Sequence, residues 1–207
     1  MRDGARTIFL IRHGETDGNA ARIVQLPDAP LSTRGIAQAE RLARRLASEG
    51  IALILSSDLV RAMTTAEHLH RATGVSVEHH PLLQERNFGD VRGTPYAHLD
   101  FDLFGLDYAP PGGESWPVFH TRVDQAWEWV QAHVADVAGP VAVVTHGLVC
   151  RSLASRHVIL PASQTVPERW ENTSVTILDG PSPWNVRLLN CATHLDGLDT
   201  TPGAAAV

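Results

Sequence analysis

Short apolar runs alternate along the chain with longer segments in which apolar residues recur every three or four positions. The runs contain many β-branched residues and little polar alternation, a pattern typical of strands buried on both faces of a parallel sheet. They span residues 7–11, 51–55, 75–77, 141–145, 175–178 and 186–189. We therefore expect six strands, most of them in the interior of the protein.

The segments with helical periodicity predict four helices between these strands. They cover residues 35–48, 58–73, 114–137 and 147–159, and a shorter helix is expected at 96–104. Ser32 and either Ser57 or Asp58 are typical N-cap residues, and Gly50 and Gly74 follow the first two helices as stops. Strands that alternate with helices predict an α/β fold, a three-layer α/β/α sandwich around a mainly parallel central sheet.

The length of 207 residues fits a single domain over residues 1–207. Residues 86–113 interrupt the alternation with Gly, Pro, Asp and aromatic residues. We expect this segment, called the excursion below, to lie beside the active site. Residues 193–207 offer few side chains for packing, and we expect them to form a flexible tail.

Composition narrows the classes of function. The apolar fraction of 43% and the charged fraction of 19% are ordinary for a globular protein. The net charge of −6 argues against a nucleic-acid partner, and no apolar run approaches the roughly 20 residues of a membrane span. The first residues lack a signal-peptide pattern. Cys150 and Cys191 are expected to be free thiols in a cytoplasmic protein.

All 17 cationic side chains are arginines, and the sequence contains no lysine. This excludes a Schiff-base lysine and the lysine of a P-loop. A bound anion must then be held by arginine, histidine, backbone N–H groups or a metal. The 11 histidines lack the spacing of a closed zinc site, so we expect neither a metal nor a cofactor.

Polar side chains stand where three predicted strands end. Arg12 and His13 follow the first strand, His146 follows 141–145, and Arg61 lies in the first turn of the helix after 51–55. Ligands of such sheets bind at the carboxyl ends of strands, and a helix N-terminus favours an anion there. A single Arg-His-Gly triplet is more often just a polar strand end. The prediction of an anion site therefore depends on all of these residues together with the carboxylate of Glu85.

Taken together, these motifs resemble those of the histidine phosphatase superfamily, also called the phosphoglycerate mutase-like family. The matching segments are residues 12–19, 31–38, 56–66, 83–93, 111–115 and 145–151. The resemblance covers nearly the whole chain and implies the phosphoglycerate mutase-like fold.

The resemblance also implies a role for each matching residue. His13 corresponds to the nucleophile that becomes phosphohistidine, and Glu85 to the proton donor for the leaving alcohol. A cationic cradle around the phosphoryl group is implied for Arg12, Arg61 and His146. Further phosphate or substrate contacts are implied for Asn19, Thr16, Gly147, Arg86 and Arg92. These roles agree with the chemistry, because phosphoryl transfer needs charge compensation, an in-line nucleophile and an acid for the leaving oxygen.

Three functions are compatible with this resemblance. We favour a phosphomonoester hydrolase acting on a small phosphorylated metabolite, because the excursion carries four aspartates against two arginines. A phosphoglycerate mutase is the alternative, since residues 85–89 resemble the mutase motif. A non-catalytic phospho-ligand binding module ranks lowest, because no expected catalytic residue is missing. The sequence carries no signal for an oligomeric state.

Two details remain open at the level of the sequence. Asp90 or Asp102 is the alternative proton donor. The acid-phosphatase branch, which has an aspartate after the second histidine, is disfavoured by Gly147. Leu26 stands where the family often has a glycine, and the loop before it is one residue short, which leaves the local phosphate contacts uncertain.

Overall fold

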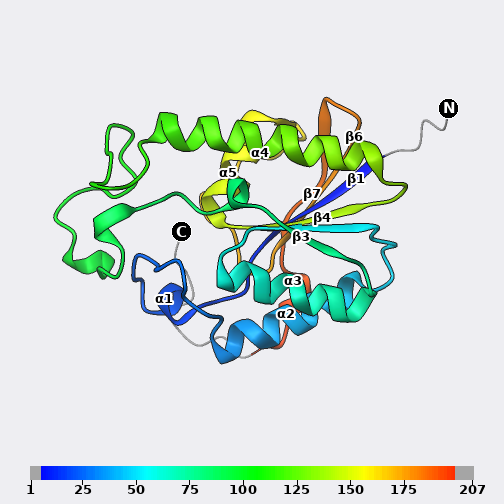
Figure 1. Cartoon of the computed structure of the whole chain (residues 1–207), viewed down its shortest axis with the longest axis horizontal. Helices are drawn as coiled ribbons and strands as arrows, with labels where there is room; N and C mark the ends of the chain where they lie inside the picture. Colours follow the sequence, from blue (N-terminus) through cyan, green and yellow to red (C-terminus); the bar gives the residue numbers. More distant parts are fainter. Residues whose placement is uncertain (1–5, 199–207) are drawn as a thin grey trace.

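A computed structural model describes residues 6–198, which form a seven-stranded sheet covered by helices (Figure 1). The strand order is β3-β2-β4-β1-β6-β7-β5. The strands are β1 (Arg6–Arg12), β2 (Leu53–Ser56), β3 (Val77–His79), β4 (Val141–Thr145), β5 (Val158–Ile159), β6 (Val175–Gly180) and β7 (Trp184–Cys191). Strand β6 pairs antiparallel with both of its neighbours, and the other pairings are parallel. The mainly parallel sheet is therefore confirmed.

The helices form two layers, one on each face of the sheet (Figure 1). The helices are α1 (Asp17–Ala20), α2 (Thr33–Leu46), α3 (Val60–Thr73), α4 (Trp116–Asp136) and α5 (Gly147–Arg156). Helices α2 and α3 pack with Phe9, Ile11 and Ile54 in one core. Helices α4 and α5 pack with Ile8 and Leu10 in the other. Because successive residues of β1 enter opposite cores, the unbroken apolar run is what a strand between two helical layers requires.

Several predicted boundaries are corrected by the structure. The third strand is β3, which lies two residues later than predicted. It faces solvent at the sheet edge, so its apolar pattern is weak and the sequence does not locate it well. The helix predicted over 147–159 ends at Arg156, and Val158 pairs with Trp184 of β7 as part of β5. A single 3₁₀ turn, η3 (Tyr96–His98), replaces the short helix predicted at 96–104.

The N-terminus of α3 is also built differently from the prediction. Its N-cap position is Leu59, which has no side-chain capping bond. The Ser57 hydroxyl instead accepts the backbone N–H of Leu59 at 3.2 Å. Ser32, in contrast, caps α2 as predicted by accepting the N–H of Gly35. Ser57 is thereby left pointing at the end of the sheet, where His146 lies.

The first part of the predicted tail is packed onto α2. Arg41 donates to the carbonyl of Asp196 at 2.8 Å, and Arg45 lies 3.0 Å from Nδ1 of His194, which belongs to η4 (Thr193–Leu195). Two arginines of α2 thus hold residues 193–198 against the helix, and the flexibility expected of the tail stays a prediction. Residues 199–207 lie outside the described part of the chain.

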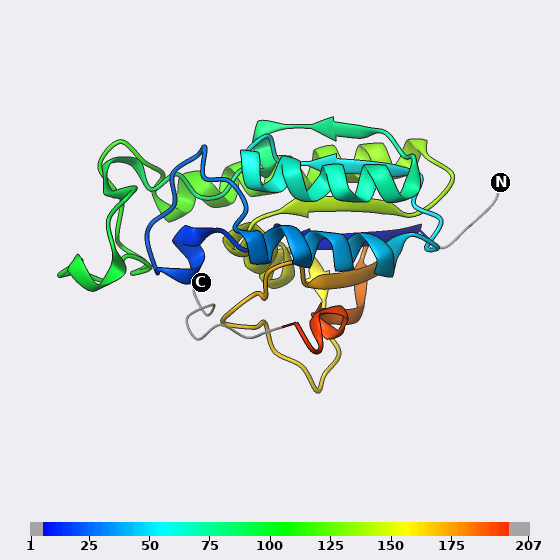
Figure 2. The same ribbon diagram turned by 90° about the horizontal axis from the view of Figure 1, so that it is seen from below.

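The excursion lies beyond the carboxyl ends of the parallel strands, beside the loop that contains α1 (Figure 2). The two segments are joined by backbone hydrogen bonds: Val24 donates to Thr94, Gly93 to Val24, and Tyr96 to Arg22. The excursion is therefore fastened to the polar end of the sheet. Among residues 6–198, no helix is long and apolar enough to cross a membrane.

Candidate active site

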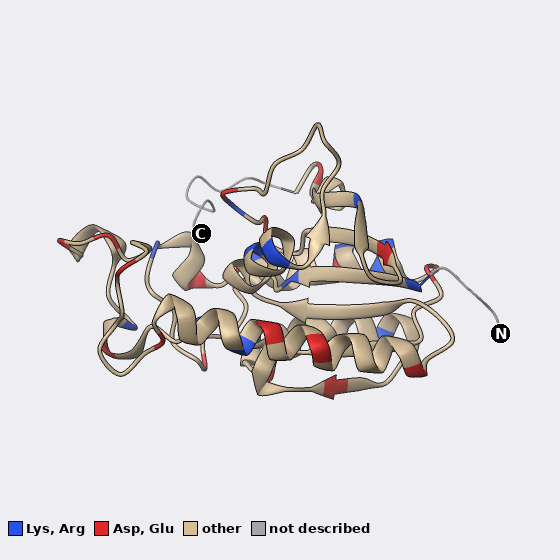
Figure 3. Cartoon of the chain, turned by 90° about the horizontal axis from the view of Figure 1, so that it is seen from above, with Lys and Arg blue, Asp and Glu red and all other residues tan. Residues whose placement is uncertain are grey.

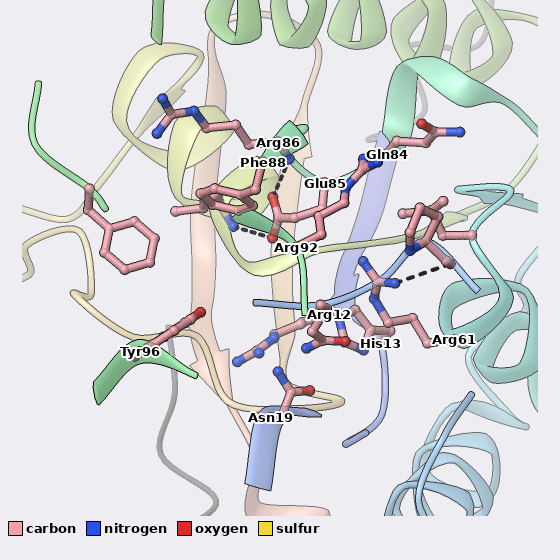
Figure 4. A pocket seen from close by; sticks show the side chains of 15 residues that line it. Arg12, His13, Asn19, Arg61, Gln84, Glu85, Arg86, Phe88, Arg92 and Tyr96 are labelled. Atoms are coloured by element: carbon pink, nitrogen blue, oxygen red, sulfur yellow. Dashed lines mark hydrogen bonds between the residues drawn. The ribbon is translucent and has the colours of Figure 1, made fainter. Parts of the chain in front are cut away.

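A pocket lies where β1, β2 and β4 end, between the α1 loop and the excursion (Figure 4). Most of its wall is polar, and the excursion contributes one side of it. The lining residues are Arg12, His13, Asn19, Gln25, Pro27, Leu59, Arg61, Gln84, Glu85, Arg86, Phe88, Arg92, Tyr96, Phe104 and Leu148. The predicted residues Arg12, His13, Arg61 and Glu85 thus meet at one place, whereas His146 is not among the residues that line it.

His13 is held rigidly at the end of β1. Its backbone N–H donates to Thr145 at 2.9 Å, and its ring Nδ1 lies 2.7 Å from the carbonyl of Gly14. A carbonyl can only accept, so Nδ1 carries the proton and Nε2 keeps a lone pair. Burial, reinforced by the charges of Arg61 and Arg12, holds the pKa of His13 well below its usual value. The ring is therefore neutral and able to attack an electrophile near pH 7.

Arg12 and Arg61 bring two buried guanidinium groups to the same pocket. Both side chains are buried, and Arg12 donates through Nη1 to the carbonyl of Trp170. Arg61 donates to the carbonyl of Leu26 at 3.1 Å. Burial lowers the pKa of Arg61 to about 10, which still leaves it charged. Buried guanidinium groups with one side on a pocket match the oxygens of a phosphoryl group.

Two details of Arg61 bear on the ligand. Its Nε atom is buried and has no hydrogen-bond partner among the described residues. Such a donor is costly unless a ligand or water satisfies it, which favours an acceptor in this pocket. Leu26 contacts Arg61 through its backbone carbonyl, while its side chain is half-exposed. Replacing a glycine by leucine there is therefore compatible with this contact.

His146 lies beside His13, with 5.0 Å between the ring centroids. Its Nε2 is 2.8 Å from the hydroxyl of Ser57, and its buried Nδ1 has no hydrogen-bond partner in the described part of the chain. Burial and the neighbouring Arg61 hold its pKa well below the usual value. These surroundings favour the neutral ring of His146, and its place in the cradle stays a prediction.

Glu85 faces the pocket opposite His13 and is held by two backbone donors (Figure 4). Oε1 accepts from its neighbour Arg86 at 2.9 Å, and Oε2 accepts from Leu148 at 3.2 Å. Burial raises the pKa of Glu85, although the two N–H groups and the nearby arginines act in the opposite direction. A carboxyl group with a raised pKa suits general acid chemistry. The alternative acids, Asp90 and Asp102, are exposed and do not line the pocket.

The loop that carries Glu85 is anchored by Arg122 of α4. This guanidinium donates to the carbonyls of Leu82, Gln84 and Glu85, and it pairs with Glu114 at 2.7 Å. Three carbonyls held by one partly buried cation fix the backbone from which the acid projects. The position of Glu85 thus depends on a helix that contributes no catalytic side chain.

The remaining predicted contacts divide into two groups. Asn19 and Arg92 line the pocket. Thr16 does not line it; its hydroxyl accepts the N–H of Asn19 in a capping box at the start of α1. Gly147, the first residue of α5, is likewise absent from the pocket wall. Thr16 therefore orients a pocket residue, and the helix N-terminus reaches Glu85 through the next residue, Leu148.

Arg86 borders the pocket with its stem, but its guanidinium turns away (Figure 4). It donates to the carbonyls of Glu114 and Tyr108 and lies 4.1 Å from the ring centroid of Trp116. These contacts pull the charge into the packing beneath the excursion. These contacts give Arg86 a structural role, but its Nη1 has no hydrogen-bond partner among the described residues. Its substrate contact therefore stays a prediction, and Arg92 is the excursion's other cation in the pocket wall.

Sequence reasoning missed the segment that supports His13 from behind. Asn172 donates from Nδ2 to the carbonyl of His13 at 3.0 Å and to Oδ1 of Asn19 at 3.3 Å. The N–H of Thr173, whose φ is 56°, also reaches the carbonyls of Arg12 and His13. A left-handed threonine is uncommon and is maintained here by these bonds. The segment lies about 160 positions away, so only tertiary structure reveals its place.

Comparison with known proteins decides the family. The family model described as "Histidine phosphatase superfamily (branch 1)" matches residues 8–191 of this chain. The protein belongs to the histidine phosphatase superfamily. The curated relatives include one named "Probable phosphoglycerate mutase GpmB" from Proteus mirabilis, which is 34% identical over 188 residues and 86% of each chain.

Solved structures of this superfamily share the fold. The mycobacterial glucosyl-3-phosphoglycerate phosphatase in complex with VO3 is 30% identical, with a TM-score of 0.74 over 89% of this chain and 97% of that one. A putative alpha-ribazole-5'-P phosphatase from Escherichia coli is 27% identical, with a TM-score of 0.80 over 91% and 98%. The phosphoglycerate mutase-like fold is therefore confirmed, and the protein is an enzyme of this histidine phosphatase family.

Proposed function

We propose that the protein is a phosphomonoester hydrolase that acts on a small phosphorylated metabolite through a phosphohistidine intermediate. The observation that carries this proposal is the bond from His13 Nδ1 to the Gly14 carbonyl, which leaves Nε2 as the free nucleophile in a pocket lined by Arg12 and Arg61. These arginines supply the positive charge that phosphoryl transfer needs, so we propose a metal-independent reaction. Both cysteines are free thiols, which supports a cytoplasmic protein.

The proposed reaction has two steps. In the first, Nε2 of His13 attacks phosphorus, the ester P–O bond breaks, and Glu85 gives its proton to the leaving oxygen. In the second, water attacks phosphorus, the P–N bond breaks, and the Glu85 carboxylate takes the proton from that water. Arg12 and Arg61 compensate the charge on the phosphoryl oxygens throughout, and His146 adds a hydrogen bond beside them.

We favour hydrolysis over mutase activity, but for a different reason from the count of aspartates in the sequence. Acidic positions are scattered along the excursion (Figure 3). Its four aspartates are all exposed and absent from the pocket wall. They therefore do not repel an anionic substrate from the pocket. Support comes instead from the small number of cations outside the cradle: two donors of Arg86 are taken by the carbonyls of Glu114 and Tyr108, and Arg92 is the other arginine of the pocket wall.

The names of relatives point in both directions. Two of the structural neighbours are phosphatases of different phosphorylated metabolites, whereas the curated relatives carry the name of a mutase. Because the named substrates differ among these neighbours, the proposal names the reaction and the class of substrate, a small phosphorylated metabolite, and no single compound.

Phosphate release from p-nitrophenyl phosphate tests the enzyme. We expect turnover in the wild type, its loss in His13→Ala, and its retention in His79→Ala, which alters an exposed histidine on β3. Turnover that survives in His13→Ala contradicts the proposed nucleophile. Binding of vanadate without turnover of any ester supports the non-catalytic module instead.

A second assay separates hydrolase from mutase. With 3-phosphoglycerate as substrate, free phosphate and 2-phosphoglycerate are measured in the same reaction. We expect phosphate release from phosphomonoesters to exceed isomerisation. Isomerisation that is faster than phosphate release from every ester tested identifies a mutase and contradicts the proposal.

A further inference from the structure

A second cavity, of about 290 Å³, adjoins the phosphoryl pocket. Its walls are mostly apolar and come from the excursion, the start of α4, one side of α5 and the loop that contains Val166. Phe104 and Leu148 line both spaces, so the cavity begins where the phosphoryl pocket ends. No step of the proposed reaction uses this cavity.

The position of the acid directs the leaving group toward this cavity. Glu85 accepts the N–H of Leu148 at 3.2 Å, and the side chain of Leu148 forms the border between the two spaces. An oxygen that receives a proton from Glu85 lies next to this border. The carbon skeleton attached to that oxygen then has an apolar space directly beside it.

The aromatic wall of the cavity is fixed before any ligand arrives. Trp116 donates from Nε1 to the carbonyl of Gly105 at 2.9 Å, and its ring stacks on His120 with a centroid distance of 5.5 Å. The guanidinium of Arg86 lies against the same ring at 4.1 Å. A wall held in this way loses little conformational entropy when a ligand packs against it.

The chemistry of the cavity favours an apolar ligand. The hydroxyl of Ser152 is already bonded to His120 Nδ1 at 2.9 Å, and Arg151 and Ser155 lie exposed at the rim. Leu106 is 84% exposed at the cavity, an unusually open position for a large apolar side chain. Burial of such a surface by a ligand is favourable at roughly 25 cal/mol per Å².

We propose that this cavity binds the leaving group, and that the natural substrates are phosphomonoesters of alcohols with a substantial apolar or aromatic part. The inference rests on the proposed hydrolase function. A cavity of about 150 Å³ holds benzene, so the volume of about 290 Å³ suits a two-ring system or a medium alkyl chain. Phosphoglycerates, whose carbon skeleton is short and polar, gain nothing from such a wall.

A series of n-alkyl phosphates from ethyl to hexyl tests the inference. The leaving alcohols have nearly equal acidity, so kcat/KM for phosphate release reports the binding of the chain. Each buried methylene contributes about 0.8 kcal/mol, which corresponds to roughly a fourfold gain. We expect kcat/KM to rise by at least about tenfold from ethyl to hexyl phosphate, even if burial is incomplete.

Two rim variants and a matched control locate the effect. Leu106→Asp places a charge at the cavity, and Ser155→Trp fills it from an exposed position; both are expected to reduce the hexyl-to-ethyl ratio toward one. Ile159→Asp changes another exposed apolar residue, on β5 outside the cavity, and should keep the wild-type ratio.

The outcomes distinguish the two proposals. If kcat/KM is independent of chain length, or if both rim variants keep the wild-type ratio, the cavity does not bind the leaving group, although hydrolysis itself stands. If no ester releases phosphate, the hydrolase function fails and the inference fails with it.

Discussion

Replacement of Glu85 by glutamine removes the proposed acid while keeping the shape of its side chain. The expected loss depends on the leaving group, because only a poor leaving oxygen needs a proton in the transition state. General acid catalysis contributes about 10²- to 10⁴-fold, or about 2.7 to 5.4 kcal/mol of barrier. We therefore expect kcat/KM for an alkyl phosphate to fall by that factor, and kcat/KM for p-nitrophenyl phosphate to fall by no more than about tenfold.

The same variant has a structural cost that must be measured separately. Both carboxylate oxygens of Glu85 accept backbone N–H groups, from Arg86 and Leu148. A glutamine offers one oxygen and one NH₂ group, so one of these donors faces another donor, which costs about 1–3 kcal/mol. Burial disfavours the charged form of Glu85, so removing this carboxyl group acts in the opposite direction on the free energy of unfolding. Thermal unfolding of the variant shows whether the fold persists, and Asp90→Asn, an exposed carboxylate-to-amide change, is the matched control.

The pH profile gives the decisive result. Burial raises the pKa of Glu85, so the protonated acid persists to a higher pH than an ordinary glutamate and is lost as pH rises through that pKa. The alkaline limb of kcat/KM for an alkyl phosphate should follow this loss and should be absent in Glu85→Gln. A Glu85→Gln enzyme that keeps the wild-type rate and the wild-type alkaline limb refutes Glu85 as the acid.

Three further predictions follow from the same geometry. Ser57→Ala removes the hydroxyl 2.8 Å from His146 Nε2 and should lower kcat about tenfold, with rescue by Ser57→Thr; an unchanged kcat contradicts a positioning role. Arg61→Lys keeps the positive charge but loses the paired N–H donors of the guanidinium group, and it should lower kcat/KM about 10²-fold. Near-normal kinetics exclude a bidentate contact between Arg61 and the phosphoryl group. The fold lowers the pKa values of His13 and His146. As pH falls below about 6.5, only the unfolded state gains their protons, so the free energy of unfolding falls by about 1.4 kcal/mol per pH unit for each histidine. Urea unfolding measures the free energy of unfolding at several pH values below 6.5. This free energy should fall less steeply with decreasing pH in His13→Asn than in His79→Asn, and equal slopes contradict the lowered pKa of His13.

Interior strands were predictable because both of their faces are buried. All five residues of β4 are buried, and the strand coincides with the predicted apolar run. The edge strand β3 has two exposed residues out of three and was displaced in the prediction. Val158 and Ile159 continue the helical spacing of α5, so periodicity extended the helix across them. Only their pairing with Trp184 and Asn185, far along the chain, makes them a strand.

The site was predictable where side chains act at strand ends, and was not where the backbone acts. His13, Arg61 and Glu85 line the pocket, and the motifs that resemble the family had placed all three at the proposed site. Trp170 holds Arg12 through a carbonyl, an interaction that any residue can make and that leaves no mark in the sequence. Arg86 shows the converse, because its residue type suggested a substrate contact, whereas packing against Trp116 determined where its charge lies.

The charges of the pocket connect binding to catalysis. Among the described residues that line it, Glu85 is the single carboxylate, and it shares the wall with Arg12, Arg61, Arg86 and Arg92. The charges of Arg61 and Arg12 favour the glutamate anion and oppose its protonation. The negative charge of a bound phosphoryl dianion offsets the charge of these arginines and so raises the pKa of Glu85. The group that the arginines bind therefore also promotes protonation of the acid by solvent, and a proton should be taken up when vanadate binds to the wild type but not when it binds to Glu85→Gln.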